Sequence, residues 1–206
     1  MSHKPILVGL GEILWDLFPD GKRLGGAPAN FAYHGQALGA DAAVVSRVGK
    51  DDLGREVIDY LDSVGLNHAH IGEDPDHPTG KVTVTLDDAG KPRYVIHTDV
   101  AWDFIETTND MLALAARADA TCFGSLCQRS AVSRKSVAAY LGATRPGSLR
   151  IFDINLRQHY YTQELIESML TISNVVKLND EELPVIADLF GMETGEEDRV
   201  QTLLEQ

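Results

Sequence analysis

Residues 25–39, GGAPANFAYHGQALG, decide the fold that we expect. Gly25 and Gly26 allow a tight turn, and Pro28 suits the first turn of a helix, where its missing N–H would be unpaired in any case. Small residues that permit close packing against a sheet follow at Ala29, Ala32, Gly35 and Ala37. The stretch therefore predicts a glycine loop that leads into a helix over residues 28–38.

Short apolar runs typical of buried strands flank this helix. Residues 5–12, PILVGLGE, are interrupted and closed by glycines and predict a central parallel strand. Similar runs follow at residues 42–49, 118–125, 149–155 and 173–179. Further helices are predicted between or after them, at residues 53–64, 109–116, 130–141, 162–172 and 181–190. The alternation predicts an α/β fold with a doubly wound, Rossmann-like, mostly parallel sheet and helices on both faces.

Two segments interrupt the alternation and are typical of antiparallel ribbons. One covers residues 13–24, and the other covers residues 79–99 with a turn at residues 88–90. Because such ribbons fit poorly inside a parallel sheet, we expect them to form a small lid over a pocket at the carboxyl ends of the strands. Residues 191–206 predict a further acidic helix, and we treat residues 1–206 as one incomplete α/β domain.

The composition favours a globular protein that binds neither nucleic acid nor membranes. The chain has 206 residues and a formal net charge of −13, which disfavours contact with a phosphate backbone. The sequence contains no apolar stretch long enough to span a bilayer and no signal-peptide pattern, so we expect a cytoplasmic protein. Cys122 and Cys127 are too few for a disulfide framework and are expected to be buried thiols.

Polar residues near the predicted strand ends are candidates for binding a polyhydroxylated ligand. Asn30 offers a donor and an acceptor in the first helical turn, and Asp16 could accept hydrogen bonds from two neighbouring hydroxyls. Asn155 and Arg157 follow the fourth predicted strand, where open sheets bind ligands, and arginine is suited to phosphates and carboxylates. Structural alternatives remain for two of these features. The glycine loop before Asn30 could be a plain strand-to-helix turn, and Asp16 could be an exposed acid on a hairpin.

The segment KLNDEE, residues 177–182, follows the fifth predicted strand. Asn179 and Glu182 lie one helical turn apart, so the pair could hold a hydrated Mg²⁺ and nucleotide phosphates. The same N-x-x-E spacing also describes a capping box that needs no further function.

The order of these motifs resembles the ribokinase-like, phosphofructokinase-B-type carbohydrate kinases, and residues 11–32 are most similar to bacterial fructokinases. The resemblance implies ATP-dependent phosphorylation of a sugar hydroxyl, with fructose as the first candidate and with ATP and Mg²⁺ as cofactors. It also implies sugar contacts from Asp16, Gly25, Gly26, Asn30 and Arg157, the last of them lying near the transferring phosphate in the transition state. Asn179 and Glu182 would organise Mg²⁺ and the ATP phosphates, with Glu182 acting through water. A homodimer that pairs through the lid is a further expectation.

Two departures from the family pattern limit this expectation. Ala27 stands where ribokinases usually carry lysine, which counts against ribose and for a hexose or a related acid. The family's catalytic base is an aspartate in a G-A-G-D motif of the last third of the chain, and residues 182–206 contain no such motif. We therefore expect an N-terminal fragment that lacks the C-terminal part of the fold and is inactive, or nearly so, as a kinase.

Two alternatives remain at this point. One is a kinase for another substrate, such as 2-keto-3-deoxygluconate or a nucleoside, and an acid sugar would use Arg157 as its carboxylate partner. The other is a non-catalytic sugar-binding protein.

Overall fold

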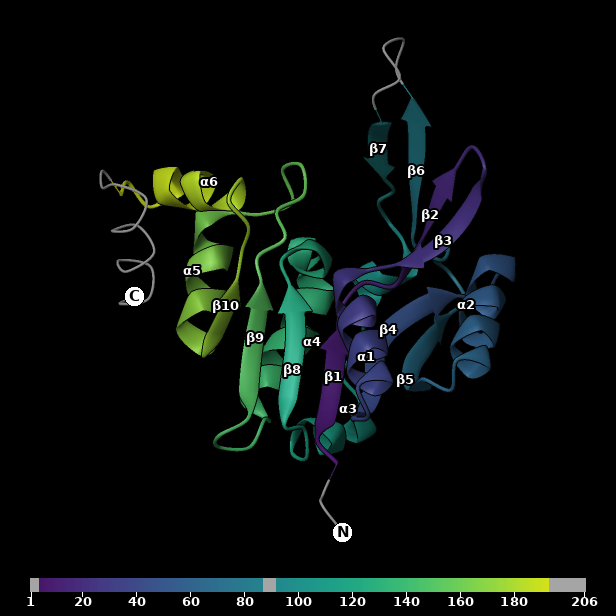
Figure 1. Cartoon of the computed structure of the whole chain (residues 1–206), viewed down its shortest axis with the longest axis horizontal. Helices are drawn as coiled ribbons and strands as arrows, with labels where there is room; N and C mark the ends of the chain where they lie inside the picture. The colour runs from purple at the N-terminus through teal and green to yellow at the C-terminus, as the bar shows by residue number, and fades with distance from the viewer. Residues whose placement is uncertain (1–3, 87–91, 193–206) are drawn as a thin grey trace.

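The structure, a computed structural model, describes residues 4–86 and 92–192. Residues 193–206 of the predicted acidic helix and the predicted turn at residues 88–90 lie outside these ranges. The described part of the chain contains a six-stranded sheet in the order β10-β9-β8-β1-β4-β5, in which every neighbouring pair is parallel (Figure 1). Its strands are β1 (Ile6–Leu10), β4 (Asp41–Gly49), β5 (Asn67–Asp74), β8 (Ala120–Gly124), β9 (Leu149–Asp153) and β10 (Val175–Lys177).

Helices cover both faces of this sheet, as predicted. They are α1 (Ala27–Ala37), α2 (Asp52–Ser63), α3 (Asn109–Ala115), α4 (Ala131–Gly142), α5 (Gln163–Ile172) and α6 (Glu182–Leu189), and each boundary lies within one residue of the predicted one. Side chains of β4 alternate between two apolar clusters. Val44 packs in one cluster with residues of α1 and α2, whereas Val45 packs in the other with residues of α3 to α6. The predicted doubly wound α/β fold is confirmed.

Close contact between α1 and β1 depends on a glycine. A Cβ atom on Gly9, in β1, would lie 1.9 Å from the carbonyl oxygen of Pro28, so only glycine lets the helix start so near the strand. Gly26 precedes the helix with a φ of 112°, and a Cβ there would lie 2.3 Å from the carbonyl oxygen of Glu12. These two glycines bring the N-terminus of α1 to the carboxyl end of the central strand.

Strand β5 was not predicted from the sequence. Its residues, NHAHIGED, are mostly polar, and most of them are exposed or half-buried. The strand lies at the edge of the sheet and, among the described strands, pairs only with β4. An edge strand has less apolar surface to bury than a central one, so the apolar run used to predict the other strands is missing here.

The two predicted ribbons form one small sheet. Its strands are β2 (Leu14–Phe18), β3 (Gly21–Gly25), β6 (Lys81–Leu86) and β7 (Pro92–Ile96), in the order β3-β2-β6-β7. Each ribbon is antiparallel, and β2 pairs in parallel with β6 to join them. This second sheet stands off the main one beyond the carboxyl ends of its strands (Figure 1). Two short 3₁₀ helices that the sequence did not predict, η1 (Ala101–Phe104) and η2 (Leu126–Arg129), follow β7 and β8 along the chain.

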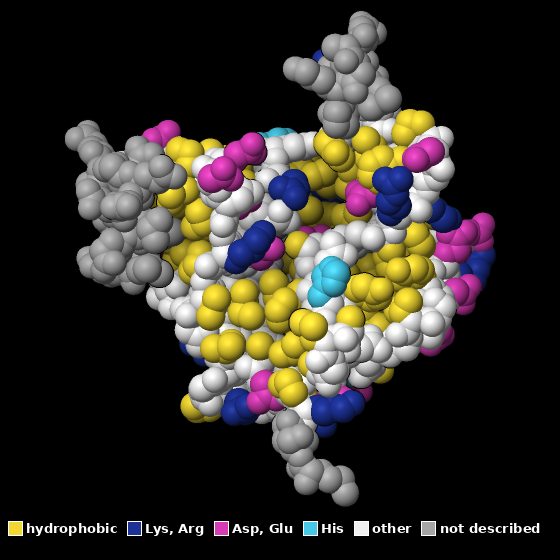
Figure 2. Space-filling model, viewed as in Figure 1, with side chains coloured by type: hydrophobic (Ala, Val, Ile, Leu, Met, Phe, Trp, Pro, Cys, Tyr) yellow, Lys and Arg dark blue, Asp and Glu magenta, His cyan; other side chains and the backbone are white. Residues whose placement is uncertain are grey.

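Part of the main sheet carries exposed apolar side chains. Leu149 of β9 and Val175 of β10 are 47% and 38% exposed, and the register of the two strands puts them on the same face. Figure 2 shows apolar side chains gathered on the side of the molecule that carries α1.

The long apolar helix that would be needed to cross a membrane does not occur in the described ranges.

Candidate functional site

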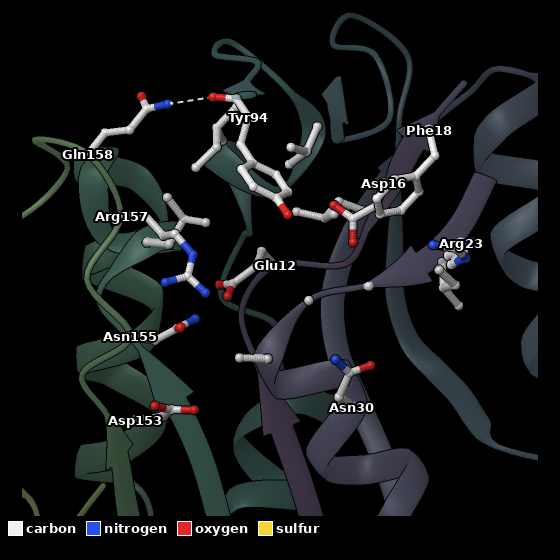
Figure 3. A pocket seen from close by; sticks show the side chains of 18 of the residues that line it. Glu12, Asp16, Phe18, Arg23, Asn30, Tyr94, Asp153, Asn155, Arg157 and Gln158 are labelled. Carbon is white, nitrogen blue, oxygen red and sulfur yellow. Dashed lines mark hydrogen bonds between the residues drawn. The ribbon is translucent and has the colours of Figure 1, made fainter. Parts of the chain in front are cut away.

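A cavity of about 1020 Å³ lies between the carboxyl ends of the main strands and the second sheet (Figure 3). Segments that are far apart in the sequence form its walls: β2, β3, the start of α1, β7 and the loop after β9. Six of the candidate residues named from the sequence line it, namely Asp16, Gly25, Gly26, Asn30, Asn155 and Arg157. The tertiary structure therefore brings the candidate sugar-contacting residues together in one place.

Asp16 projects from β2 into this cavity and is half-buried. Burial raises the pKa of its carboxyl group, and the nearby Arg157 guanidinium acts in the opposite direction. Gly25 lies beside it on β3, and a Cβ atom there would come within 2.6 Å of Asp16 Oδ2. A side chain at position 25 would therefore force the Asp16 carboxylate to move.

Asn30 lies in the first turn of α1 and is exposed at the cavity wall. Its backbone N–H donates to the carbonyl oxygen of Gly26 at 2.9 Å, and its side-chain amide projects toward the cavity (Figure 3). Gly26, the residue that precedes the helix, contributes no side chain to cap it. The cavity thus meets both an amide side chain and the positive end of a helix.

The loop after β9 forms the opposite wall. It carries Asn155 and Gln158, which have positive φ values of 43° and 49°, with Arg157 between them. Gln158 Nε2 donates to the carbonyl oxygen of Tyr94 in β7 at 3.2 Å, so the loop contacts the second sheet across the cavity (Figure 3). The Arg157 guanidinium projects into the cavity toward Glu12.

Glu12 was not among the predicted site residues. It follows β1, lines the cavity and is only 1% exposed. Burial raises the pKa of its carboxyl group to about 7, with Asp153 contributing, whereas hydrogen bonds from the backbone N–H groups of Glu12 and Ala27 and the charge of Arg157 lower it. The sequence signal was its place at the carboxyl end of a central strand, where open sheets bind ligands.

An ion pair was also missed. Lys177 Nζ lies 3.0 Å from Asp153 Oδ1, and both residues line the cavity at the last positions of neighbouring strands β10 and β9. Only strand register reveals this pairing, because 24 residues separate the partners. Among the described residues, Lys177 and Arg157 are the positively charged side chains that line the cavity near β9 and β10.

Asn179 and Glu182 form a reciprocal capping box next to the cavity. Asn179 Oδ1 accepts a hydrogen bond from the backbone N–H of Glu182 at 2.8 Å, and Glu182 Oε2 accepts one from that of Asn179 at 3.0 Å. Glu182 Oε1 accepts a third from the backbone N–H of Leu156 at 2.9 Å. Both oxygens thus already have a donor, and neither residue is among the described residues that line the cavity. The structure therefore contains the capping box that the sequence allowed as an alternative, and backbone N–H groups occupy both carboxylate oxygens of the buried Glu182.

The two cysteines lie in β8 and η2. Cys122 and Cys127 are both free and buried, as predicted. Burial raises the pKa of Cys122 to about 12 and that of Cys127 well above its ordinary value. The described ranges contain no group of three or more His, Cys, Asp or Glu side chains that could hold a metal ion.

The fold and the cavity define an α/β protein with a polar, carboxylate-lined ligand pocket between two sheets. The profile of the pfkB family carbohydrate kinases matches residues 20–206. The chain belongs to this family, which confirms the resemblance described above.

Several relatives are fructokinases. The chain is 30% identical over 196 residues to the fructokinase of Vibrio alginolyticus, a match that covers 90% of this chain and 64% of that protein. It is also 30% identical over 189 residues to the fructokinase of Salmonella typhimurium, covering 86% and 61%. The chain thus spans somewhat less than two thirds of the length of these relatives.

Solved structures agree with this assignment. The sugar kinase PH1459 from Pyrococcus horikoshii in complex with ATP is 28% identical with a TM-score of 0.73, covering 89% of this chain and 66% of that one. The fructokinase of Xylella fastidiosa with bound ATP has a TM-score of 0.85 at 22% identity, covering 98% and 66%. The second likeness concerns the fold alone.

Proposed function

We propose that the intact protein transfers a phosphoryl group from ATP to a sugar hydroxyl, with fructose as the first candidate substrate. The observation that carries the proposal is the convergence of Asp16, Asn30 and Arg157 on one cavity from three separate segments. Family membership and the fructokinase relatives support the choice of substrate class.

Asp16 and Asn30 would hold the sugar. The Asp16 carboxylate would accept hydrogen bonds from neighbouring hydroxyls, and the Asn30 amide would donate to or accept from a third. Gly25 and Gly26 would let the ligand approach the backbone. The second sheet would act as a lid that orients the sugar and excludes water.

Arg157 and the capping-box residues would serve the nucleotide. Bound ATP supplies the phosphoryl group, with Mg²⁺ to offset its negative charge. Arg157 would lie near the transferring phosphate, where a guanidinium pairs well with phosphate oxygens. Asn179 and Glu182 would orient the hydrated magnesium ion, with Glu182 acting through water. The relative solved with ATP, PH1459, supports a nucleotide site in this fold.

We further propose that residues 1–206 by themselves turn over little or no sugar. The family's G-A-G-D aspartate, which takes the hydroxyl proton, has no counterpart in residues 182–206. Loss of a general base costs about 10²- to 10⁴-fold in rate, and loss of oxyanion donors costs a similar factor. Sugar-dependent ADP formation by the 206-residue chain well above a no-protein control would contradict this proposal, and a longer native chain should show full activity.

Binding of D-fructose, measured by titration calorimetry, tests the sugar site without requiring turnover. Asp16→Asn should weaken binding by about tenfold or more, because it removes a charged hydrogen-bond acceptor. Asp20→Asn is the matched control, since Asp20 lies exposed on the same hairpin and pairs with Arg23 at 3.3 Å. Equal affinities of the two variants would remove Asp16 from the site.

A non-catalytic sugar-binding protein is the second candidate. It needs only the binding part of the proposal, namely the cavity lined by Asp16, Asn30 and Arg157. Fructose binding without phosphorylation by the native, full-length protein would support it.

The proposal also covers the oligomeric state and the cellular location of the protein. We propose a cytoplasmic protein that dimerises through the second sheet, where Tyr94 and Val95 of β7 are 54% and 51% exposed. Analytical ultracentrifugation tests this pairing. A dimeric unmodified chain and a monomeric Val95→Lys variant would support a dimer that forms through the second sheet. A monomeric unmodified protein would contradict it.

A further inference from the structure

Glu12 has a buried, unpaired carboxylate oxygen beside the cavity, among the residues that the structure describes. The residue is 1% exposed, and within the described parts of the chain its Oε2 atom has no hydrogen-bond partner. Figure 3 shows the carboxylate facing the Arg157 guanidinium from the end of β1. The two groups are nevertheless not close enough to form an ion pair in the part of the chain that the structure describes.

An unpaired buried carboxylate oxygen is costly. Nearly all buried polar groups have a partner, because an unmade hydrogen bond leaves the loss of hydration uncompensated. The hydrogen bonds from the backbone N–H groups of Glu12 and Ala27 fix the orientation of the carboxyl group at the start of α1. The fold therefore positions Glu12 at the edge of the cavity and gives its Oε2 atom no partner among the described residues.

The surroundings of Glu12 favour a neutral hydroxyl donor as that partner. Asp153 on β9 raises its pKa, and Arg157 in the following loop lowers it. Cys122 on β8 and Cys127 on η2 also interact electrostatically with Glu12, and α1 contributes the N–H of Ala27. A phosphate or carboxylate oxygen placed at Oε2 would add a further negative charge beside Asp153 and Glu12. A sugar hydroxyl would instead donate a hydrogen bond.

We propose that Glu12 is a second sugar-contacting carboxylate, which accepts a hydrogen bond from a ligand hydroxyl through Oε2 and binds the sugar in its ionised form. The inference rests on the proposed sugar-binding function and adds a residue and a charge state to it. Asp16 and Glu12 would then hold the sugar from two sides of the cavity.

This role makes sugar affinity dependent on pH near neutrality. Burial raises the pKa of Glu12 to about 7 in the cavity without ligand, so the acid form predominates below that value. If the ionised form binds the sugar, affinity rises as the pH increases through 7, and binding near pH 7 releases a proton. With a single group of this pKa, the gain between about pH 6 and pH 8 is about tenfold.

Titration calorimetry of the 206-residue chain with D-fructose tests the proposal. The unmodified chain should bind about tenfold more tightly at pH 8 than at pH 6, and should release protons near pH 7 in two buffers of different ionisation enthalpy. Glu12→Gln keeps the shape of the side chain and should bind more weakly at pH 8, without this pH dependence. Glu167→Gln, at an exposed position of α5, is the matched control and should behave like the unmodified chain.

The outcomes separate the inference from the function on which it rests. Fructose binding with the same affinity and pH profile in Glu12→Gln as in the unmodified chain overturns the role of Glu12 alone. Proton release is measured on the unmodified chain, so its absence near pH 7 overturns the role even if the variant does not fold. If the folded, unmodified chain binds neither fructose nor any other sugar, the proposed function fails together with this inference.

Discussion

Arg129 and Asp103 form a bidentate ion pair beneath the second sheet. Nε lies 2.8 Å from Asp103 Oδ1 and Nη2 lies 2.8 Å from Oδ2, and both side chains are only 7% exposed. Nη2 also donates to the carbonyl oxygen of His97 at 2.7 Å, just after β7. The guanidinium stacks against Trp102 and against Tyr160 of the loop that follows Arg157. One arginine therefore supports both walls of the cavity.

Removing one partner of this pair should destabilise the fold strongly. Asp103→Ala leaves a buried guanidinium without its counter-ion, and we expect it to lower the free energy of unfolding by about 3–5 kcal/mol. Asp20→Ala breaks an exposed pair and should cost about 0.5 kcal/mol or less. Urea unfolding followed by circular dichroism measures both changes. A loss for Asp103→Ala as small as that for Asp20→Ala would show that the buried pair contributes little.

The close contact of α1 with β1 predicts that Gly9 tolerates no side chain. Gly9→Ala should destabilise the protein by about 1–3 kcal/mol or more, because the new Cβ would overlap the carbonyl oxygen of Pro28. Gly142→Ala is the matched control, at the last position of α4, where a Cβ would meet no described atom within 4 Å. The control should be neutral or stabilising by up to about 1 kcal/mol. Thermal melts of both variants test the prediction, and an unchanged Tm for Gly9→Ala would refute it.

The ionised side chain of Asp51 should stabilise the folded protein at neutral pH but not at acidic pH. Its side chain accepts hydrogen bonds from Gly54 N at 2.8 Å, Thr79 N at 2.8 Å and Thr79 Oγ1 at 2.6 Å. Burial alone would raise the pKa of Asp51, but these hydrogen bonds outweigh it and hold the pKa below its ordinary value of 3.8. The ionised form is therefore favoured in the folded state, so this stabilisation is present above 3.8 and is lost as the pH falls through the lower, folded value.

Substitution of Asp51 checks this account. Asp51→Ala removes the N-terminal cap of α2 and should cost about 1–2 kcal/mol at neutral pH. The difference in unfolding free energy between the variant and the unmodified chain should shrink as the pH falls below 3.8. Urea unfolding at a series of pH values measures it. If the difference in unfolding free energy instead grows as the pH falls, the predicted direction of the pH dependence is wrong.

The two cysteines should be unreactive in the folded protein. Burial raises the pKa of Cys122 to about 12 and raises that of Cys127 well above its ordinary value, so neither thiol ionises near neutrality. A thiol reagent such as dithionitrobenzoate at about pH 8 should label the native chain only as fast as it unfolds. The same reaction in urea is the control and should modify both thiols at once. Rapid labelling before unfolding would disprove the prediction.

Local patterns determined most of the fold and part of the site. Apolar runs marked the central strands because a strand buried on both faces must be apolar throughout. The N-x-x-E spacing of Asn179 and Glu182 described the capping box that the structure contains, because a cap depends only on neighbouring residues. Asp16, Gly25, Gly26, Asn30 and Arg157 were selected by residue type and by their place at strand ends or in the first helical turn.

The tertiary structure alone decided which distant residues meet. Parallel pairing of β2 with β6 joins two hairpins that the sequence presents separately, and register places Lys177 beside Asp153. Glu12 was not selected from the sequence, yet packing buries it and leaves one of its oxygens without a partner among the described residues. Burial, strand register and the pKa of a carboxyl group depend on neighbours from many parts of the chain, whereas strand and helix patterns depend on adjacent residues.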